Sequence, residues 1–250
     1  MDLELDGHVA LVTGASGDLG AACAELLARE GARVCITGRD AARLDSVRER
    51  IAALGATVEA IAGDLSDPEL VARLTPDGGE PNIFVHAAGH RFRYAKLHAE
   101  SEDDARAMHE IDEESFARIA KRALPAMMLR RFGRIVAITS LGASVGGAGT
   151  PRYSAAKAAL EAIVRSIAID YGRYGITANA VAPGFTATSR FASRLTEDAR
   201  ARLEGATSVK RIAEPIEIAV PVAFLCSPRA SYITGVTLHV AGGAQLNNLW

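Results

Sequence analysis

Residues 140–157 read SLGASVGGAGTPRYSAAK, and the rest of the chain is organised around this stretch. From Arg152 onward the sequence RYSAAKAALEAIVRSIAIDYG is rich in residues that favour helices. Its apolar residues recur with the spacing of an amphipathic helix, at Leu160, Ile163, Val164, Ile167 and Ala168. The stretch therefore predicts a loop that leads into a long helix packed on a core.

Three side chains in this stretch can act on one reacting group. Tyr153 and Lys157 are four residues apart, so they lie on one face of the predicted helix. A neighbouring ammonium stabilises a phenolate and lowers the pKa of the phenol, which makes the pair a tuned proton donor or acceptor. Ser140 ends the strand-like run RIVAITS, from which its hydroxyl can meet the start of the helix. A Tyr and a Lys at this spacing are common on helices, so the pair needs support from elsewhere in the chain.

A glycine-rich loop near the amino terminus gives that support. The sequence TGASGDLG, residues 13–20, follows an apolar run and precedes AACAELLARE, which has helical composition. Glycines let the backbone approach a pyrophosphate closely, and the N-terminus of the helix attracts its charge. The order strand, glycine loop, helix predicts a dinucleotide site.

Ser140, the Tyr153-x-x-x-Lys157 pair and the order of the elements resemble the short-chain dehydrogenase/reductase family over essentially the whole chain. The resemblance implies that Tyr153 is the proton donor or acceptor. It implies that Lys157 lowers the pKa of Tyr153 and holds the nicotinamide ribose, and that Ser140 orients the substrate carbonyl or alcohol.

The resemblance also implies the cofactor-binding residues. They are Gly14, Ser16, Gly17, Asp18, Leu19, Gly20, Arg39, Asp64, Leu65, Ala88, Gly89, Tyr153, Lys157, Pro183, Gly184, Thr186 and Thr188. Asp18 stands where single-domain members of the family usually carry glycine. The pattern of Gly14, Gly17 and Gly20 resembles the longer, epimerase-like branch, so Gly17 is expected to take the close-approach role. The alternative is that Asp18 weakens cofactor binding.

Residues near the ends of the second and third predicted strands indicate which dinucleotide is used. Gly38 stands where members of the family that use NAD often have an acidic residue, and Arg39 can pair with a 2′-phosphate. We therefore predict NADP, with NAD as the alternative and with Arg39 then a solvated surface charge. Asp64 and Leu65 match a pair that contacts adenine in the family, and Asp64 can also cap the helix near Pro68.

Two positions depart from the family near the predicted catalytic centre. Asp112 lies thirteen residues before Pro125, where the family has a catalytic asparagine. Its negative charge would raise the pKa of Tyr153 or partly neutralise Lys157. His86 stands where the family usually has asparagine, and we interpret it as a buried residue bonded to neighbouring backbone, with a proton shuttle as the alternative. The loop after Gly89 contains five basic side chains, which are either solvated or form a site for an anionic substrate. They are His90, Arg91, Arg93, Lys96 and His98.

Composition limits the classes of function. The chain has 250 residues, 49% of them hydrophobic, and a formal net charge of −2, which gives no electrostatic argument for nucleic acid or an anionic membrane as partner. Three scattered cysteines favour a reduced cytosol over disulfides or a metal site. The amino terminus lacks the basic start of a signal peptide, so we expect a soluble, cytoplasmic protein. The resemblance implies a homo-oligomer, either a tetramer or a dimer.

The alternation of strand and helix patterns predicts one α/β domain, residues 1–250, with a doubly wound parallel sheet of about seven strands. The expected strands are residues 8–12, 33–39, 57–61, 83–87, 133–140, 176–182 and 236–240. Residues 185–211 show little periodicity and are expected to form a lid over the substrate.

The predicted function is an NADP(H)-dependent oxidoreductase that moves hydride between nicotinamide and a small-molecule ketone or secondary alcohol. A 3-oxoacyl thioester, a sugar and a secondary-metabolite ketone all fit as substrates. The alternative is a redox-impaired member of the family that serves as a nucleotide-binding or partner subunit.

Overall fold

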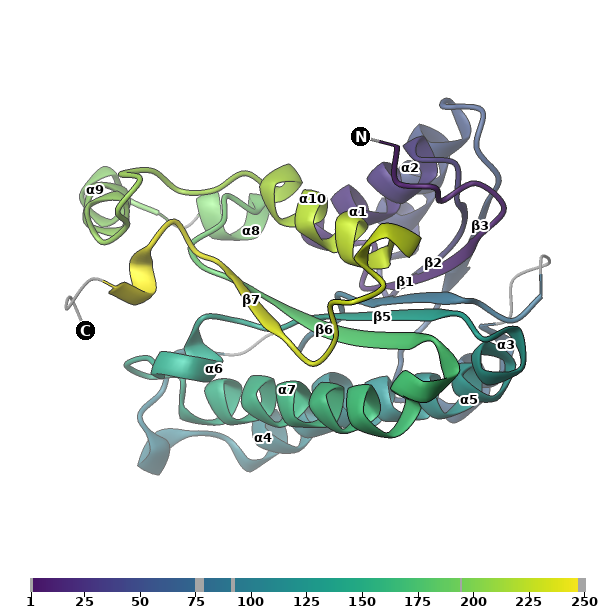
Figure 1. Ribbon diagram of the computed structural model, residues 1–250. Coiled ribbons are helices and arrows are strands. Elements are labelled where there is room, and N and C mark those ends of the chain that lie inside the picture. Colours follow the sequence, from purple (N-terminus) through teal and green to yellow (C-terminus); the bar gives the residue numbers. More distant parts are fainter. Residues whose placement is uncertain (1, 75–78, 91–92, 194, 247–250) are drawn as a thin grey trace.

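A computed structural model describes residues 2–74, 79–90, 93–193 and 195–246. Its centre is a seven-stranded sheet with the order β3-β2-β1-β4-β5-β6-β7, and all six strand pairs are parallel (Figure 1). The strands are β1 (Val9–Thr13), β2 (Arg33–Gly38), β3 (Val58–Ala62), β4 (Ile83–His86), β5 (Gly133–Ile138), β6 (Ile176–Pro183) and β7 (Thr237–Val240). The predicted doubly wound sheet is confirmed.

The four central strands β1, β4, β5 and β6 are buried along their whole length. Continuous apolar runs are typical of parallel strands, because crossover helices cover both faces of the sheet. β5 ends at Ile138, two residues earlier than the sequence predicted. Ser140 therefore lies on the loop after the strand and not on the strand itself.

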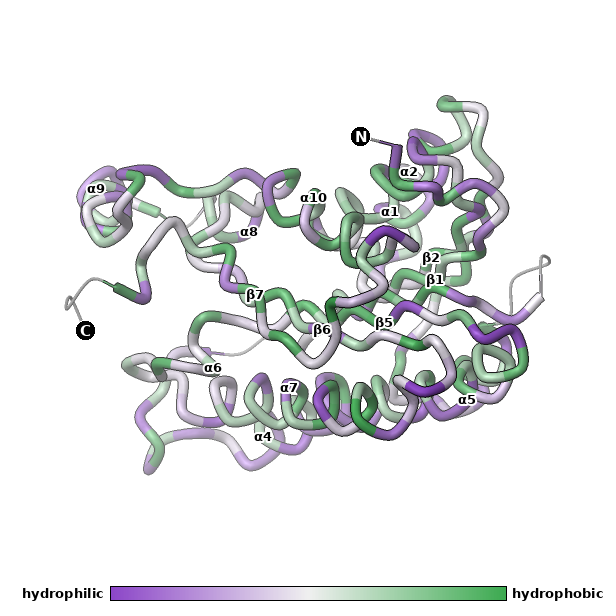
Figure 2. Tube along the Cα trace, in the orientation of Figure 1, coloured by the Kyte–Doolittle hydropathy of each residue, from purple (hydrophilic) through white to green (hydrophobic). Residues whose placement is uncertain are grey.

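Helices cover both faces of the sheet (Figure 1). One layer contains α1 (Asp18–Arg29), α2 (Ala41–Ala52) and α10 (Pro215–Cys226), and the other contains α3 (Pro68–Arg73), α5 (Ser115–Arg130) and α7 (Pro151–Tyr171). Hydrophobic residues, drawn in green, are frequent along the central strands (Figure 2). Each layer buries its own apolar cluster against the sheet, with Leu27, Ile36 and Val222 in the first and Phe84, Phe116 and Leu160 in the second.

The helix that carries Asp112 is interrupted. α4 (Glu102–Met108) continues into a π-helical turn, His109–Glu114, before α5 begins. The hydroxyl of Ser115 donates a hydrogen bond of 2.7 Å to the Ile111 carbonyl. Single π turns inside α-helices often occur at functional sites. The sequence indicated a plain helix here, whereas Asp112 lies buried within the π turn.

Residues 185–211, the segment expected to form a lid, contain two short helices, α8 (Ser189–Ala192) and α9 (Glu197–Gly205). One local expectation needs correction. Asp67 and not Asp64 caps α3, because its carboxylate accepts the Glu69 N–H. The carboxylate of Asp64 instead accepts hydrogen bonds from the backbone and hydroxyl of Ser66.

The remaining elements are short: α6 (Gly142–Val145) and 3₁₀ turns at Leu97–Ala99, Gly172–Tyr174, Pro228–Ala230 and Ala244–Leu246. Cys23, Cys35 and Cys226 are fully buried free thiols, as expected of small core residues. Within the described ranges, no helix has the length and apolar character needed to cross a bilayer. The same residues contain no cluster of three or more side chains suited to holding a metal ion.

Candidate active site

A cleft of about 630 Å³ opens at the carboxyl ends of the strands, where β1 and β4 lie side by side. Twelve of the predicted cofactor residues line it: Gly14, Ser16, Gly17, Asp18, Leu19, Gly20, Arg39, Asp64, Leu65, Ala88, Gly89 and Thr188. In open α/β sheets such a crevice is the usual place for a dinucleotide. The structure thus brings together segments that are up to 174 residues apart in sequence.

Two glycines shape this cleft by close approach. Gly14 has φ +68°, and a Cβ there would lie 2.6 Å from the backbone of Ala87 and Ala88. A Cβ on Gly38 would lie 2.5 Å from the hydroxyl of Ser16. A side chain at position 38, including an acidic one, therefore has no room unless Ser16 moves.

Two of the arginines that line the cleft, Arg39 and Arg43, have an acidic neighbour. Arg39 Nη1 lies 3.9 Å from Asp64 Oδ2, and Arg43 Nη2 lies 3.3 Å from Asp18 Oδ1. Burial tends to raise the pKa of Asp64, but hydrogen bonds from Ser66 and the charge of Arg39 hold that pKa below its ordinary value. Both arginine side chains are about half exposed, so a bound anion can reach them.

A second cleft, of about 580 Å³, adjoins the first and shares Leu19, Ala87, Ala88, Gly89, Thr188 and Arg190 with it. Tyr153 and Lys157 line this cleft, as does His90. Its walls include five large apolar side chains that the sequence analysis did not single out: Tyr94, Phe185, Phe191, Leu195 and Leu203. Phe185 alone had a signal, because it follows the Pro183-Gly184 turn at the end of β6.

Ser140 and Tyr153 both lie close to Gly142, although Ser140 itself lines neither cleft. A Cβ on Gly142 would lie 3.4 Å from Ser140 Oγ and 4.0 Å from Tyr153 Cε1. The Gly142 N–H donates a hydrogen bond of 3.1 Å to Ser140 Oγ. Because this hydroxyl accepts from the backbone, its own hydrogen is left to donate to another oxygen.

Lys157 and Asp112 form a buried ion pair behind Tyr153. Lys157 Nζ lies 2.6 Å from Asp112 Oδ1, with side-chain exposures of 6% and 0%. Lys157 also donates a 3.3 Å hydrogen bond to the Ile138 carbonyl, and Asp112 Oδ2 accepts one of 3.3 Å from the His90 N–H. Burial lowers the pKa of Lys157, but the carboxylate of Asp112 and the oxygen of Tyr153 outweigh it, so the pKa is raised overall. Of the two effects expected of Asp112, direct pairing with Lys157 is the one that the geometry supports.

Gly89 packs against this ion pair. A Cβ there would lie 3.2 Å from Asp112 Oδ1 and 3.5 Å from Lys157 Nζ. The absence of a side chain at Gly89 keeps the pair within reach of the wall that the two clefts share.

His86 is completely buried at the end of β4, as predicted, and has the backbone of Ile111 and the side chain of Thr13 as neighbours. Its Nδ1 lies 3.0 Å from the hydroxyl of Thr13, a side chain of β1, and its ring meets Phe84 and Phe116 edge-on. Burial and the nearby charge of Lys157 lower its pKa to about 3. His86 is therefore neutral at physiological pH and supports the junction of β1 and β4.

The other predicted residues are more peripheral. Pro183 ends β6, and Gly184 and Thr186 follow it; none of the three lines either cleft, and a Cβ on Gly184 would lie 2.8 Å from Ala241 Cα. Of the loop cations, His90 lines the second cleft, Arg93, Lys96 and His98 line neither, and Arg91 lies outside the described residues.

Comparison with known proteins gives consistent matches. Residues 14–245 match a family model described as enoyl-(acyl carrier protein) reductase. The 3-oxoacyl-[acyl-carrier-protein] reductase of Vibrio cholerae is 37% identical over 98% of this chain and 100% of its own length. A solved short-chain dehydrogenase/reductase family protein is 36% identical, with a TM-score of 0.89 and coverage of 97% of this chain and 99% of its own. A 3-oxoacyl (acyl-carrier-protein) reductase from Agrobacterium tumefaciens C58, solved with NADP bound, is 31% identical with a TM-score of 0.91, covering 97% and 96%.

The buried ion pair makes a prediction about stability. Asp112→Ala leaves the ammonium of Lys157 buried without its counter-ion and should lower the free energy of unfolding by about 3 kcal/mol. Adding Lys157→Met removes the second charge and should recover part of that loss. Urea unfolding of the single and double variants measures both values. As a control, Asp45→Ala breaks an exposed pair with Arg48 and should cost less than about 0.5 kcal/mol. Additive losses in the double variant would contradict the pairing.

Proposed function

The chain belongs to the short-chain dehydrogenase/reductase family, and from this premise we propose that it is an NADP(H)-dependent reductase of ketones with an apolar body. The observation that carries the proposal is the sharing of one wall by two clefts, one lined by the glycine loop and the other by Tyr153 and Lys157. A nicotinamide ring at that wall would face the phenol of Tyr153. Hydride and proton would then reach the same carbonyl group from two sides.

The apolar walls of the second cleft support the substrate class. Tyr94, Phe185, Phe191, Leu195 and Leu203 surround the space next to Tyr153. Such walls favour a 3-oxoacyl thioester or a secondary-metabolite ketone over a sugar, whose hydroxyls would lose hydrogen bonds to water there. The likeness to 3-oxoacyl-[acyl-carrier-protein] reductases points in the same direction.

The residues of the first cleft suit NADP better than NAD. The family uses NAD or NADP, and the close approach of Gly38 to Ser16 leaves no room for an acidic side chain that would bind a free ribose 2′-hydroxyl. Arg39 at the same rim can hold a 2′-phosphate through its planar fork. The start of α1 with Gly14, Ser16 and Gly17 would hold the pyrophosphate, and Pro183, Gly184 and Thr186 would support the nicotinamide end. When bound, the cofactor supplies the hydride.

The side chains divide the remaining work. Ser140 would donate its hydrogen to the substrate oxygen, because its Oγ already accepts from Gly142. As negative charge develops on that oxygen, Tyr153 would give it a proton. Lys157 would hold its positive charge near the phenol and bind the ribose. Asp112 would fix the position of Lys157 and moderate its charge.

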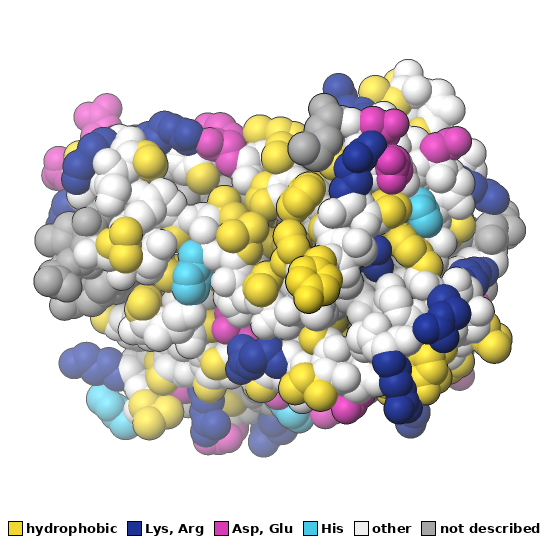
Figure 3. Space-filling model, in the orientation of Figure 1, with side chains coloured by type: hydrophobic (Ala, Val, Ile, Leu, Met, Phe, Trp, Pro, Cys, Tyr) yellow, Lys and Arg dark blue, Asp and Glu magenta, His cyan; other side chains and the backbone are white. Residues whose placement is uncertain are grey.

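We extend the proposal to assembly and location. Exposed apolar side chains gather on and beside α10 and β7: Ile216, Val220, Tyr232, Val236 and Leu238. Figure 3 shows hydrophobic side chains gathered in the middle of its face. β7 is also an edge strand, which leaves this face suited to pairing with a second copy in a dimer or tetramer.

The cytoplasm, where the three thiols stay reduced, is the proposed location.

A carbonyl panel tests the reaction. NADPH oxidation should be seen with apolar ketones, and Tyr153→Phe should abolish most turnover while the Kd of NADPH stays nearly unchanged, since only the hydroxyl is lost. Tyr174→Phe, which removes the hydroxyl of a tyrosine that lines neither cleft, serves as the matched control and should keep turnover. A wild-type kcat in Tyr153→Phe would contradict the role of Tyr153 as the proton donor. If NADPH binds but no carbonyl in the panel is reduced, the alternative function is favoured, in which the protein is a redox-impaired, nucleotide-binding partner subunit.

The choice of dinucleotide is tested by binding. Arg39→Ala should weaken NADPH by the loss of a charge-assisted bond, about 1.5–3 kcal/mol or roughly tenfold to a hundredfold in Kd. NADH, which lacks the 2′-phosphate, should bind as before. Arg48→Ala, which removes an arginine of α2 outside the cleft, is the matched control. Titration by intrinsic fluorescence gives both constants, and equal loss for NADPH and NADH would reject the phosphate role.

The pairing of Asp112 with Lys157 predicts a change in pH dependence. The carboxylate of Asp112 raises the pKa of Lys157, so Lys157 is cationic throughout the working range, but its charge is partly compensated. In Asp112→Asn the charge is uncompensated and favours the deprotonated phenol that alcohol oxidation needs. In Asp112→Asn, the pH at which alcohol oxidation begins should therefore be lower than in the wild type by up to about one unit. The pH above which ketone reduction declines should be lower by a similar amount. Superimposable profiles of kcat/KM against pH for the two proteins would exclude this role.

A further inference from the structure

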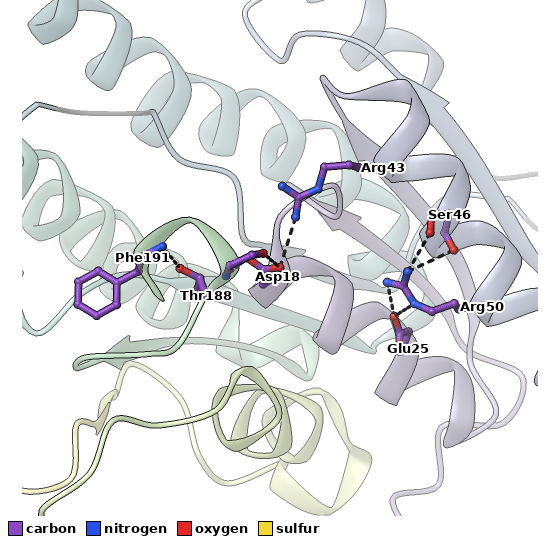
Figure 4. Close-up of polar contacts among 8 residues, drawn as sticks. Asp18, Glu25, Arg43, Ser46, Arg50, Thr188 and Phe191 are labelled. Atoms are coloured by element: carbon purple, nitrogen blue, oxygen red, sulfur yellow. Dashed lines mark hydrogen bonds and ion pairs between the residues drawn. The ribbon is translucent and has the colours of Figure 1, made fainter. Parts of the chain in front are cut away.

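Asp18 connects three parts of the chain that meet at the two clefts. It is the first residue of α1, directly after the glycine loop. Its Oδ1 accepts hydrogen bonds from the Ser189 hydroxyl at 2.6 Å and from Arg43 Nη2 at 3.3 Å, and its Oδ2 accepts the Ser189 N–H at 2.9 Å. Figure 4 shows this carboxylate between Arg43 of α2 and the start of α8. A glycine at position 18 would make none of these bonds.

Ser189 is the first residue of α8, the short helix whose side chains line both clefts. The chain before it is fixed to Ala213, whose N–H donates to the Phe185 carbonyl and whose carbonyl accepts the Ala187 N–H. Thr188 then caps α8, its hydroxyl accepting the Phe191 N–H at 3.3 Å (Figure 4). Thr188 and Arg190 line both clefts, and Phe191 lines the second. Asp18 therefore anchors α8 at the point where its side chains turn toward the clefts.

The bonds to Asp18 are of the stronger kind. The acceptor is a carboxylate that receives one backbone donor, one hydroxyl and one guanidinium, and its side chain is only 26% exposed. Hydrogen bonds to a charged acceptor are roughly twice as strong as neutral ones, and partial burial reduces competition from water. A four-residue helix has little stability of its own, so an external anchor has a large influence on its position.

We propose that Asp18 is a positioning residue that latches α8, the first helix of the predicted lid, to the glycine loop and so holds Arg190 and Phe191 over the clefts. Displacement of α8 then requires both Ser189 bonds to break. The latch joins the dinucleotide side of the site to the substrate side through contacts within the chain. It stands whether or not the proposed reaction is correct.

The chain offers a matched control on the same two helices. Glu25 of α1 pairs with Arg50 of α2 at 2.8 Å, which resembles the Asp18–Arg43 pair but has no contact with α8 (Figure 4). Glu25→Ala and Asp18→Ala therefore each remove a carboxylate of α1 and break its ion pair with an arginine of α2. Only Asp18→Ala also releases Ser189.

Amide hydrogen exchange of the unliganded protein tests the latch. The Phe191 and Ala192 amides are bonded to Thr188, so they report on the integrity of α8. In Asp18→Ala their exchange should be at least about tenfold faster than in the wild type, since each lost charge-assisted bond changes the opening equilibrium by about that factor. Asp18→Asn keeps one acceptor oxygen and should lie in between. Ser189→Ala keeps the backbone bond and should show a smaller increase than Asp18→Ala.

Glu25→Ala should leave these amides at the wild-type rate even if it lowers the melting temperature as much as Asp18→Ala does. Exchange at Phe191 and Ala192 that is unchanged in Asp18→Ala, or equally fast in Glu25→Ala, would overturn the proposal. With a ketone from the panel, Asp18→Ala should raise KM severalfold and change kcat less, because the anchor of the roof is lost while Ser140, Tyr153 and Lys157 stay in place. Loss of kcat at unchanged KM would also count against a positioning role.

Discussion

The contact between β1 and β4 is the constraint on which the site depends. These strands are neighbours in the sheet although two strand and helix units separate them in sequence, and the order of the sheet reverses at this point. Gly14 after β1 meets the backbone of Ala87 and Ala88 after β4 so closely that a Cβ does not fit. Helices leave the two strands toward opposite faces, and the crevice between them is where both clefts open.

A pair of opposite charges is buried behind this crevice. Lys157, Asp112 and His86 are all nearly inaccessible; the first two form an ion pair, and burial lowers the pKa of His86 to about 3. An unpaired ammonium at this depth would be strongly destabilising, whereas the pair with Asp112 is tolerated and holds Lys157 in one place. His86 lies between the charged pair and the aromatic core, and it spans the β1–β4 junction through Thr13. The chain thus holds a fixed positive charge next to Tyr153 without leaving it exposed to water.

The sequence was enough to predict the sheet, the glycine loop and the Tyr153–Lys157 pair, because each rests on local periodicity or on spacing within one element. It was not enough for contacts whose partners are far apart. Asp18 and Ser189 are separated by 171 residues, and nothing in either local sequence indicates the other. The π turn at Asp112 was missed because a one-residue insertion leaves no trace in composition. The apolar cleft walls come from segments without periodicity, such as Tyr94 and Leu195, whose proximity arises only when the sheet has formed.

The parallel order of the sheet also governs how a growing chain can fold. β1 pairs with β2 early, but its other edge waits for β4, whose residues lie 73 positions later, as in the pairing of Ala10 with Ile83. Until that segment leaves the ribosome, one edge of an apolar strand is unpaired and the glycine loop has no wall to pack against. Pairings of such long sequence separation form slowly, because the intervening loop must be closed first. The half of the chain that would bind the nucleotide is therefore made first but completed late, and until then its unpaired strand edge is a place where the newborn protein can aggregate.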